Sequence, residues 1–217
     1  MVATIQRNLI LGQSVIRLRI PADPEQVLQE AVEGTEAGNR YVDPYWGLLW
    51  DAAPRTAERI LRHPWQNGLR SLELGCGVGL TGIAGLIAGL DVTFTDLVPA
   101  AVEMAISNAR DNGFQNAQGH VLDWCSPTNT TFPFIFASDV LYDLQNHDPL
   151  LNVLSRMLTP DGMVWIGDAG RANAPIFLEK AKAIGWMIEL SDIDGRILSQ
   201  PSHVSFQLIT MTRPNGA

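Results

Sequence analysis

Three glycines spaced by one residue, Gly75, Gly77 and Gly79, follow an alternating apolar run that ends at Leu74. Glycine tolerates positive φ and lets the backbone approach a ligand that a Cβ would push away. A turn between a strand and a helix also presents the free N–H groups of the helix N-terminus. Because a long apolar segment follows, residues 72–82 predict a strand, a tight turn and a helix that cradle a nucleotide or a related cofactor.

The acidic residues beside this turn bear on which cofactor it holds. The pattern Gly77-x-Gly79-x-x-Gly82 satisfies a dinucleotide fingerprint, but a lone match of this kind has low specificity. Asp96, about 20 residues further along, could accept both ribose hydroxyls of either cofactor. Glu73, inside the strand before the turn, favours S-adenosylmethionine, whose sites use a carboxylate near the methionine end. The structural alternative makes Glu73 a solvated edge residue and Asp96 a helix cap.

Four aspartates lie where predicted strands end: Asp96, Asp123, Asp139 and Asp168. In an open parallel sheet, the carboxyl ends of the strands line the ligand crevice, so these side chains are candidates for binding or catalysis. Aspartate also caps helices and begins turns, and that explanation fits Asp168 in particular.

Aromatic residues gather just upstream of the glycine turn, at Tyr45, Trp46 and Trp50. This density is unusual for a chain that is 7% aromatic. Core packing is the default explanation for such residues. Their position before a cofactor turn equally fits the floor of a pocket.

The bulk composition indicates one globular α/β domain, or one domain with a small appendage, in 217 residues of which 46% are hydrophobic. The net charge of −8, without a Lys/Arg cluster, argues against nucleic acid as a partner and suits a cationic substrate. Cys76 and Cys125 cannot form a disulfide framework, and neither they nor the four histidines have metal-ligand spacing. We therefore expect no metal site.

The first 20 residues lack a signal-peptide core, and no apolar run approaches the length of a membrane span. We therefore expect a cytoplasmic protein that does not engage a membrane.

The remaining patterns predict alternating strands and helices, and hence an α/β fold with a mainly parallel sheet. Residues 4–20 predict an N-terminal hairpin around Gly12, and a helix is expected from Pro24 to about Gly34, before a loop at 38–44. Strands are expected at 72–74, 92–96, 117–123, 133–138, 163–167, 186–193 and 203–211, helices at 52–62, 80–89, 99–112, 149–158 and 174–184, and a turn at 160–162.

Over about residues 40 to 170, these motifs resemble those of the seven-β-strand S-adenosylmethionine-dependent methyltransferases. Glu73-x-Gly75-x-Gly77-x-Gly79 looks like their first motif, Asp96 like their ribose-binding acid, and Asp123-Trp124 like the pair that flanks the adenine. The resemblance implies an enzyme with a Rossmann-like, seven-stranded, mainly parallel sheet, helices on both faces and a final β-hairpin. It divides the chain into an N-terminal hairpin and helix extension, residues 1–40, and a methyltransferase domain, residues 41–217.

Two further motifs are similar to those of a branch that includes protein-lysine methyltransferases. Asp139-Val140-Leu141-Tyr142 looks like the D-x-x-Y motif after the fourth strand, and residues 45–53 look like the upstream tryptophan motif. The resemblance implies a protein substrate that presents a lysine, with Asp139 holding the amine and Tyr142 closing the channel. It implies S-adenosylmethionine as cofactor, bound by Trp50, Glu73, Gly75, Gly77, Asp96, Asp123 and Trp124.

Alternatives from other classes stay open at this point. The methyl acceptor could be a small amine or another metabolite, which a deep, closed pocket beside Tyr142 would favour. A nicotinamide-dependent oxidoreductase could use the glycine pattern that starts at Gly77, but the common Tyr-x-x-x-Lys pair is absent because Asn146 follows Tyr142 by four positions. A catalytically dead scaffold would be expected to have lost glycines or acids that are intact here.

Overall fold

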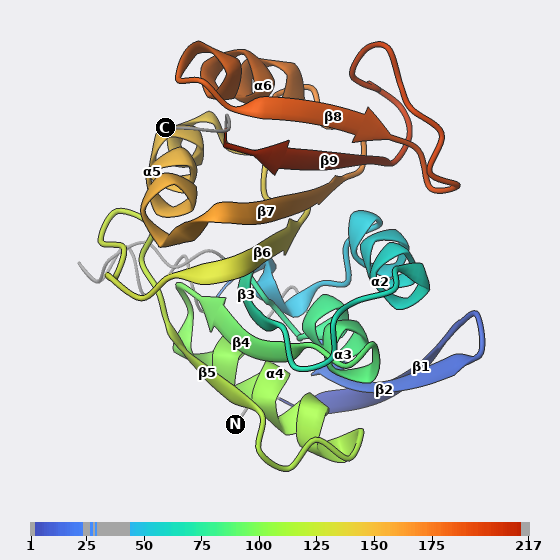
Figure 1. Ribbon diagram of the computed structural model, residues 1–217. Coiled ribbons are helices and arrows are strands. Elements are labelled where there is room, and N and C mark those ends of the chain that lie inside the picture. Colours follow the sequence, from blue (N-terminus) through green and yellow to red (C-terminus); the bar gives the residue numbers. More distant parts are fainter. Residues whose placement is uncertain (1–2, 24–26, 28, 30–43, 214–217) are drawn as a thin grey trace.

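A seven-stranded sheet forms the centre of the molecule in the computed structural model, which describes residues 3–23, 27, 29 and 44–213 (Figure 1). Its strands lie in the order β5-β4-β3-β6-β7-β9-β8. Strand β9 runs antiparallel to β7 and β8, and the other neighbours are parallel. The predicted sheet and its final hairpin are therefore confirmed. The strands are β3 (Arg70–Leu74), β4 (Asp91–Asp96), β5 (Gln118–Val121), β6 (Phe132–Ser138), β7 (Leu158–Asp168), β8 (Met187–Ser191) and β9 (Gln207–Thr212).

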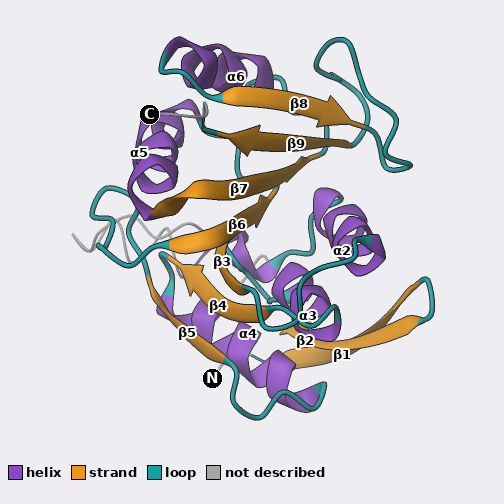
Figure 2. Cartoon of the chain, in the orientation of Figure 1, coloured by secondary structure: helices purple, strands orange, loops and turns teal. Residues whose placement is uncertain are grey.

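Helices cover both faces of this sheet, as predicted (Figure 2). Phe134 and Phe136 of β6 pack on one face with α2, α3 and α4, whereas Ile135 and Ala137 pack on the other with α5 and α6. Successive residues of a strand point to opposite faces, so a strand buried on both sides is apolar throughout. The helices are α2 (Ala52–Arg62), α3 (Leu80–Ile87), α4 (Pro99–Asp111), α5 (His147–Met157) and α6 (Ala174–Ala183), with short 3-10 turns η1 (Pro44–Gly47) and η2 (Leu144–Asn146).

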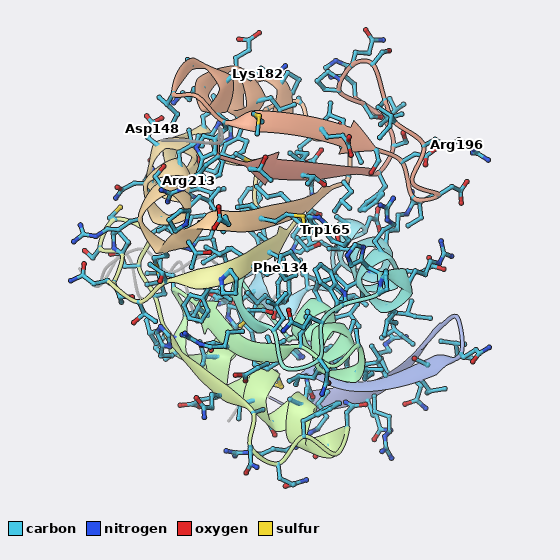
Figure 3. All side chains as sticks on the ribbon, in the orientation of Figure 1. Phe134, Asp148, Trp165, Lys182, Arg196 and Arg213 are labelled. Carbon is cyan, nitrogen blue, oxygen red and sulfur yellow. The ribbon has the colours of Figure 1, made fainter. Side chains whose placement is uncertain are left out.

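The side chains follow the division between core and surface that the sequence pattern indicates. Phe134 and Trp165 lie in the middle of the molecule, with 0% and 4% of their surface exposed, whereas Lys182 and Arg196 project from its outside (Figure 3). Among the described residues, every helix is too short or too polar to span a bilayer.

Two strands, β7 and β9, begin four or five residues from their predicted starts at 163 and 203. Strand β7 begins at Leu158, which pairs with Phe132, and the register then shifts so that Phe134 pairs with Met163. Residues 159–162, where a turn was expected, are an unpaired irregularity within β7. Strand β9 begins at Gln207 and not at 203. The Oγ of Ser202 accepts hydrogen bonds from the N–H groups of Val204 and Ser205, so this segment satisfies its backbone locally and does not join the sheet.

The predicted N-terminal hairpin is confirmed as β1 (Thr4–Leu11) and β2 (Ser14–Pro21), which form a separate two-stranded sheet beside α4 and α3 (Figure 1). The helix expected from Pro24 to Gly34 and the loop at 38–44 lie outside the described residues, apart from Val27, Gln29 and the start of η1. The division of the chain at residue 40 stays a prediction.

Two asparagines at the end of α4 attach this hairpin to the glycine turn. The side-chain amide of Asn108 accepts from the N–H of Arg19 at 2.8 Å and donates to the carbonyls of Arg19 and Val78 at 2.9 and 2.8 Å. The amide of Asn112 makes the same pair of bonds with the backbone of Arg17, at 3.0 and 2.6 Å. The two amides thus satisfy alternate residues of β2, as a neighbouring strand would.

We expect Asn108→Ala to lower the free energy of unfolding by about 2–3 kcal/mol, because it leaves the buried carbonyl of Val78 and the part-buried backbone groups of Arg19 without partners. Asn112→Ala is the matched control: its bonds to Arg17 are exposed, so water replaces them and the loss should stay below about 1 kcal/mol. Urea denaturation of both variants measures the difference. Equal losses would show that Asn108 does not hold the hairpin.

Candidate active site

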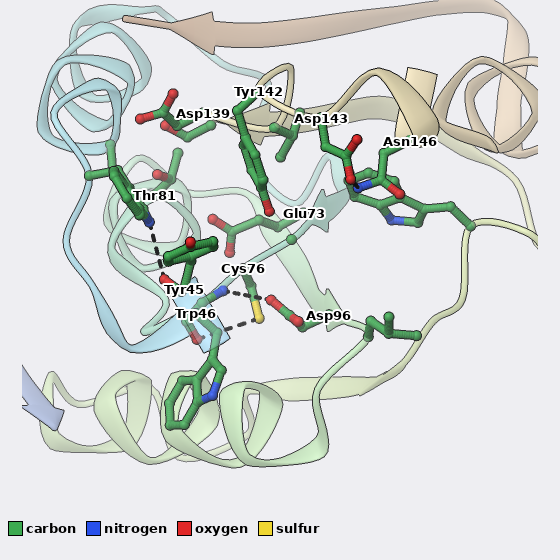
Figure 4. A pocket seen from close by; sticks show the side chains of 18 of the residues that line it. Tyr45, Trp46, Glu73, Cys76, Thr81, Asp96, Asp139, Tyr142, Asp143 and Asn146 are labelled. Carbon is green, nitrogen blue, oxygen red and sulfur yellow. Dashed lines mark hydrogen bonds between the residues drawn. The ribbon is translucent and has the colours of Figure 1, made fainter. Parts of the chain in front are cut away.

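A cavity of about 520 Å³ opens at the carboxyl ends of β3, β4 and β6 (Figure 4). Its wall comes from the aromatic segment before α2, the glycine turn, and the loops that follow β4, β5 and β6. All nine residues predicted from the sequence line it: Trp50, Glu73, Gly75, Gly77, Asp96, Asp123, Trp124, Asp139 and Tyr142. The topology therefore brings together side chains that lie far apart in the sequence.

The glycine turn has the backbone conformation that its sequence predicts. Gly75, Gly77 and Gly79 have φ values of 64°, 50° and 87°, a region that other residues rarely adopt. A Cβ at Gly77 would lie 3.0 Å from the carbonyl oxygen of Trp46, and one at Gly79 would lie 2.8 Å from Ala105. The turn is thus pressed between the aromatic segment and α4, and it leaves its cavity side open.

Glu73 is buried, with 2% of its surface exposed, yet it lines the cavity. Its Oε1 accepts the N–H of Gly82 at 3.0 Å, and its Oε2 has no partner among the described residues. Burial raises the pKa of this carboxyl well above its usual range, and the nearby Asp96 raises it further, while the Gly82 N–H acts against both. A buried carboxylate with an unpartnered oxygen is a site for a cationic or hydrogen-bond-donating ligand group.

Asp96, at the end of β4, holds the cradle together. Its Oδ2 accepts the N–H of Gly77 and its Oδ1 the N–H of Val98, both at 3.0 Å. The carboxylate thereby joins the glycine turn to the start of α4. Figure 4 shows Asp96 beside Cys76 on the lower side of the cavity. Burial raises the pKa of the Cys76 thiol well above its usual range, which supports assigning it no chemistry.

Asp123 and Trp124 lie in the loop after β5, at the outer end of the cavity. Oδ1 of Asp123 accepts the N–H of Cys125 at 2.9 Å, which folds this loop back on itself. The Trp124 ring reaches the glycine turn, since its Cζ2 would lie 3.7 Å from a Cβ placed on Gly75. A flat, half-buried ring next to the turn is suited to cover a heterocyclic base.

Asp139 has a partner that the sequence did not reveal. Its oxygens accept two hydrogen bonds from Arg171, 2.7 Å from Nε and 2.8 Å from Nη2. Asp139 is also the one non-glycine residue of the described chain with positive φ, 59°. Such a conformation is strained for most residues, though aspartate tolerates it, and it is frequent at functional sites. Arg171 stands 32 positions away in sequence and belongs to no recognisable motif, so only the fold connects the pair.

Aromatic rings surround this ion pair at the mouth of the cavity. Tyr45 makes edge-on contacts with Trp50 and Tyr142, with ring centroids 5.7 and 6.4 Å apart. The guanidinium of Arg171 lies over the Trp50 ring, 5.2 Å from its centroid. Tyr45 and Tyr142 are 40% and 37% exposed. The aromatic segment therefore forms a wall of the cavity, as the pocket interpretation of these residues predicted.

Asp168, the fourth strand-end aspartate, does not line the cavity. Its Oδ2 accepts the N–H groups of Gly170 and Arg171 and the side-chain amide of Gln207. Burial raises the pKa of its carboxyl, and these donors act against the rise. Its role is structural, in a turn, as the alternative explanation held.

Carboxylates dominate the charge of the cavity. Five acidic side chains line it, and the described lining residues include no lysine, arginine or histidine. The acids are Glu73, Asp96, Asp123, Asp139 and Asp143. No group of three or more His, Cys, Asp or Glu residues in the described part of the chain is arranged to hold a metal ion. The excess of acidic side chains in the lining favours a cationic ligand group.

Comparisons with known proteins agree with this geometry. A family model described as lysine methyltransferase matches residues 42–183. The electron transfer flavoprotein beta subunit lysine methyltransferase of Xenopus laevis is 31% identical over 136 residues, which cover 61% of this chain and 55% of that protein. EEF1A lysine methyltransferase 3 of Mus musculus is 28% identical over 154 residues, covering 67% of this chain and 66% of that protein.

Among solved structures, the TehB-like SAM-dependent methyltransferase from Corynebacterium glutamicum is similar, with a TM-score of 0.61 and 25% identity, covering 88% of this chain and 98% of that one. The matched segment is about half the length of the flavoprotein-directed relative, at 55% of that protein.

The buried Glu73 gives a testable pH dependence. In the unfolded chain this carboxyl ionises near its ordinary value of 4.5, whereas the folded protein holds its proton to higher pH. The folded state then binds more protons, so this residue lowers stability as pH rises above that range. We expect the stability difference between Glu73→Gln and the unsubstituted protein to grow in favour of the variant by more than about 1 kcal/mol as the pH rises from 5 to 8.

Urea denaturation at both pH values measures this gain. Glu189→Gln, a change at an exposed position of β8, is the control and should show the same difference from the unsubstituted protein at both pH values. A pH-independent effect of Glu73→Gln would contradict the burial argument.

Proposed function

The chain belongs to the lysine methyltransferase family, and from that premise we propose that it transfers a methyl group from S-adenosylmethionine to a lysine side chain of a protein. The observation that carries the proposal is the acidic cavity, with five carboxylates and no basic residue in its described lining. Sulfonium and ammonium groups are cations that such a cavity attracts. A nicotinamide dinucleotide, in contrast, carries an anionic pyrophosphate that these carboxylates would repel.

The cofactor end of the cavity fits S-adenosylmethionine residue by residue. Oε2 of Glu73 has no partner among the described residues and would accept a hydrogen bond from the ammonium of the methionine end, beside Gly75 and Gly77. Asp96 would bind the ribose hydroxyls. Trp50 would provide a wall, and Asp123 and Trp124 would flank the adenine.

The bound cofactor would supply a methyl carbon activated by the sulfonium, whose C–S bond would break as an amine lone pair formed the new N–C bond. The protein then has to hold the amine in line and keep water away. Asp139 would accept a hydrogen bond from the amine and orient its lone pair, while Tyr142 closes the channel with its ring and hydroxyl. The amine releases a proton to solvent.

The exposure of the aromatic wall supports a protein as the acceptor. Tyr45 and Tyr142 reach the surface at 40% and 37% exposure, so a side chain that projects from another protein could enter between them. The alternative acceptor, a small metabolite, would favour a deep, closed pocket beside Tyr142. The names of the relatives, which describe lysine methyltransferases, support the same choice.

The state of the cysteines and the net charge bear on the cellular compartment and the partners of this protein. We propose a cytoplasmic protein, since Cys76 and Cys125 are both free thiols. The net charge of −8 supports partners that are neither nucleic acid nor an anionic membrane surface.

Methyl transfer can be tested with a labelled methyl donor and a cell lysate, whose protein and small-molecule fractions are read separately. We expect label in protein, at lysine. Asp139→Asn should reduce transfer by at least about a hundredfold and spare the affinity for the neutral product S-adenosylhomocysteine, because asparagine tolerates the positive φ but carries no charge. Asp96→Ala should weaken cofactor binding by at least about tenfold through the loss of the hydrogen-bonded carboxylate.

Label confined to small molecules would replace the protein acceptor with a metabolite. Near-normal turnover by Asp139→Asn would remove this residue from the mechanism.

A further inference from the structure

Arg171 stands at the acceptor end of the cavity, and the proposed mechanism gives it no task. Its guanidinium takes both oxygens of Asp139, at 2.7 and 2.8 Å, in the two-pronged geometry that makes arginine–carboxylate pairs strong. The Asp139 side chain is only 1% exposed and that of Arg171 is 32% exposed. The pair is thus shielded from water on its carboxylate side, where charge has its largest effect.

The loop after β7 holds Arg171 in this place. The N–H of Arg171 donates to Oδ2 of Asp168 at 3.1 Å, and so does the side-chain amide of Gln207, at 3.0 Å. Gly170 has φ of 87°, and a Cβ there would lie 2.8 Å from the backbone nitrogen of Val204. The backbone of Arg171 is therefore fixed, and its guanidinium rests on the Trp50 ring at 5.2 Å.

Arg171 stays a cation in these surroundings. Its hydrogen bonds to Asp139 raise its pKa above the ordinary value, and the charges of Asp168 and Asp51 raise it further against the effect of burial. These three carboxylates are the charged groups that face the guanidinium, from the loop after β6, the end of β7 and the start of α2. Of the three, Asp139 makes the direct ion pair.

Building on the proposed function, we propose that Arg171 is a charge-balancing and positioning residue. By pairing with Asp139, it lets this carboxylate accept a hydrogen bond from the acceptor amine without stabilising that amine as an ammonium. A carboxylate has about four lone-pair sites, of which the two bonds from Arg171 occupy two. An unpaired carboxylate would favour the protonated amine, which has no lone pair for attack on the methyl carbon.

The charge at the transfer point can be measured without knowing the substrate. Sinefungin is an S-adenosylmethionine analogue in which a carbon bearing an amine replaces the methylated sulfonium, so its ammonium probes this point. S-adenosylhomocysteine is the neutral reference there. The ratio of the two affinities, measured by calorimetry at pH 7, cancels effects on the rest of the cofactor site.

Arg171→Gln leaves Asp139 unpaired, so we expect the ratio to shift by about tenfold in favour of sinefungin. Asp139→Asn leaves the Arg171 cation unpaired, and the ratio should shift by about tenfold in the opposite direction. The double variant restores neutrality, and its ratio should return to within about twofold of the unsubstituted protein.

An unchanged ratio in both single variants would overturn the proposal and leave Arg171 as a packing residue. If Arg171→Gln does not fold, Asp139→Asn alone decides the matter. An affinity for sinefungin that does not fall relative to that for S-adenosylhomocysteine would contradict the charge balance. If neither ligand binds the unsubstituted protein, the proposed function itself is wrong and this inference falls with it. If both ligands bind and the two single variants leave the affinity ratio unchanged, this inference is refuted and the proposed function stands.

Discussion

A carboxylate buried at the centre of the sheet, that of Glu73, is the constraint on which the site depends. A carboxyl group in such a place needs hydrogen-bond partners, and the fold provides one, the N–H of Gly82. That bond requires α3 to pass so close to β3 that a Cβ at Gly82 would lie 2.3 Å from the carboxylate. The second oxygen has no partner among the described residues, and Glu73 lines the cavity, so a ligand donor that reached this oxygen would lower the cost of burying the carboxyl group.

The strand-end acids around Glu73 divide between holding the backbone and meeting ligands. Asp96 receives the N–H groups of Gly77 and Val98, so one side chain at the cavity edge also fixes the turn. Asp168 lies behind the site and shapes the loop that carries Arg171. Asp139 receives that arginine in turn. The geometry of the acceptor end is thus set by contacts among Asp139, Arg171 and Asp168, which lie in the loop after β6, the loop after β7 and the end of β7.

The sequence predicted the parts of this site whose signals are local. The closely spaced glycines Gly75, Gly77 and Gly79 indicate positive φ, which the structure shows. Aspartates that follow apolar runs indicate strand ends, which a parallel sheet gathers at one edge. The role of Arg171 was not predicted, because its pairing with Asp139 forms only when two loops that are distant in sequence meet. The start of β7 at Leu158 was not predicted because Pro160-Asp161-Gly162 has the composition of a turn, and the single pair Phe132–Leu158 before it forms only when the sheet is assembled.

Calorimetric titration of the protein with S-adenosylmethionine, S-adenosylhomocysteine and NADH tests the central claim, that the acidic cavity is a site for a cationic cofactor. The account predicts micromolar binding of the first two and no binding of NADH. It also predicts that Glu73→Gln weakens S-adenosylmethionine binding, because an amide cannot ionise to pair with the cationic group of the cofactor. Binding of NADH alone would contradict the account and make Gly77-x-Gly79-x-x-Gly82 a dinucleotide site.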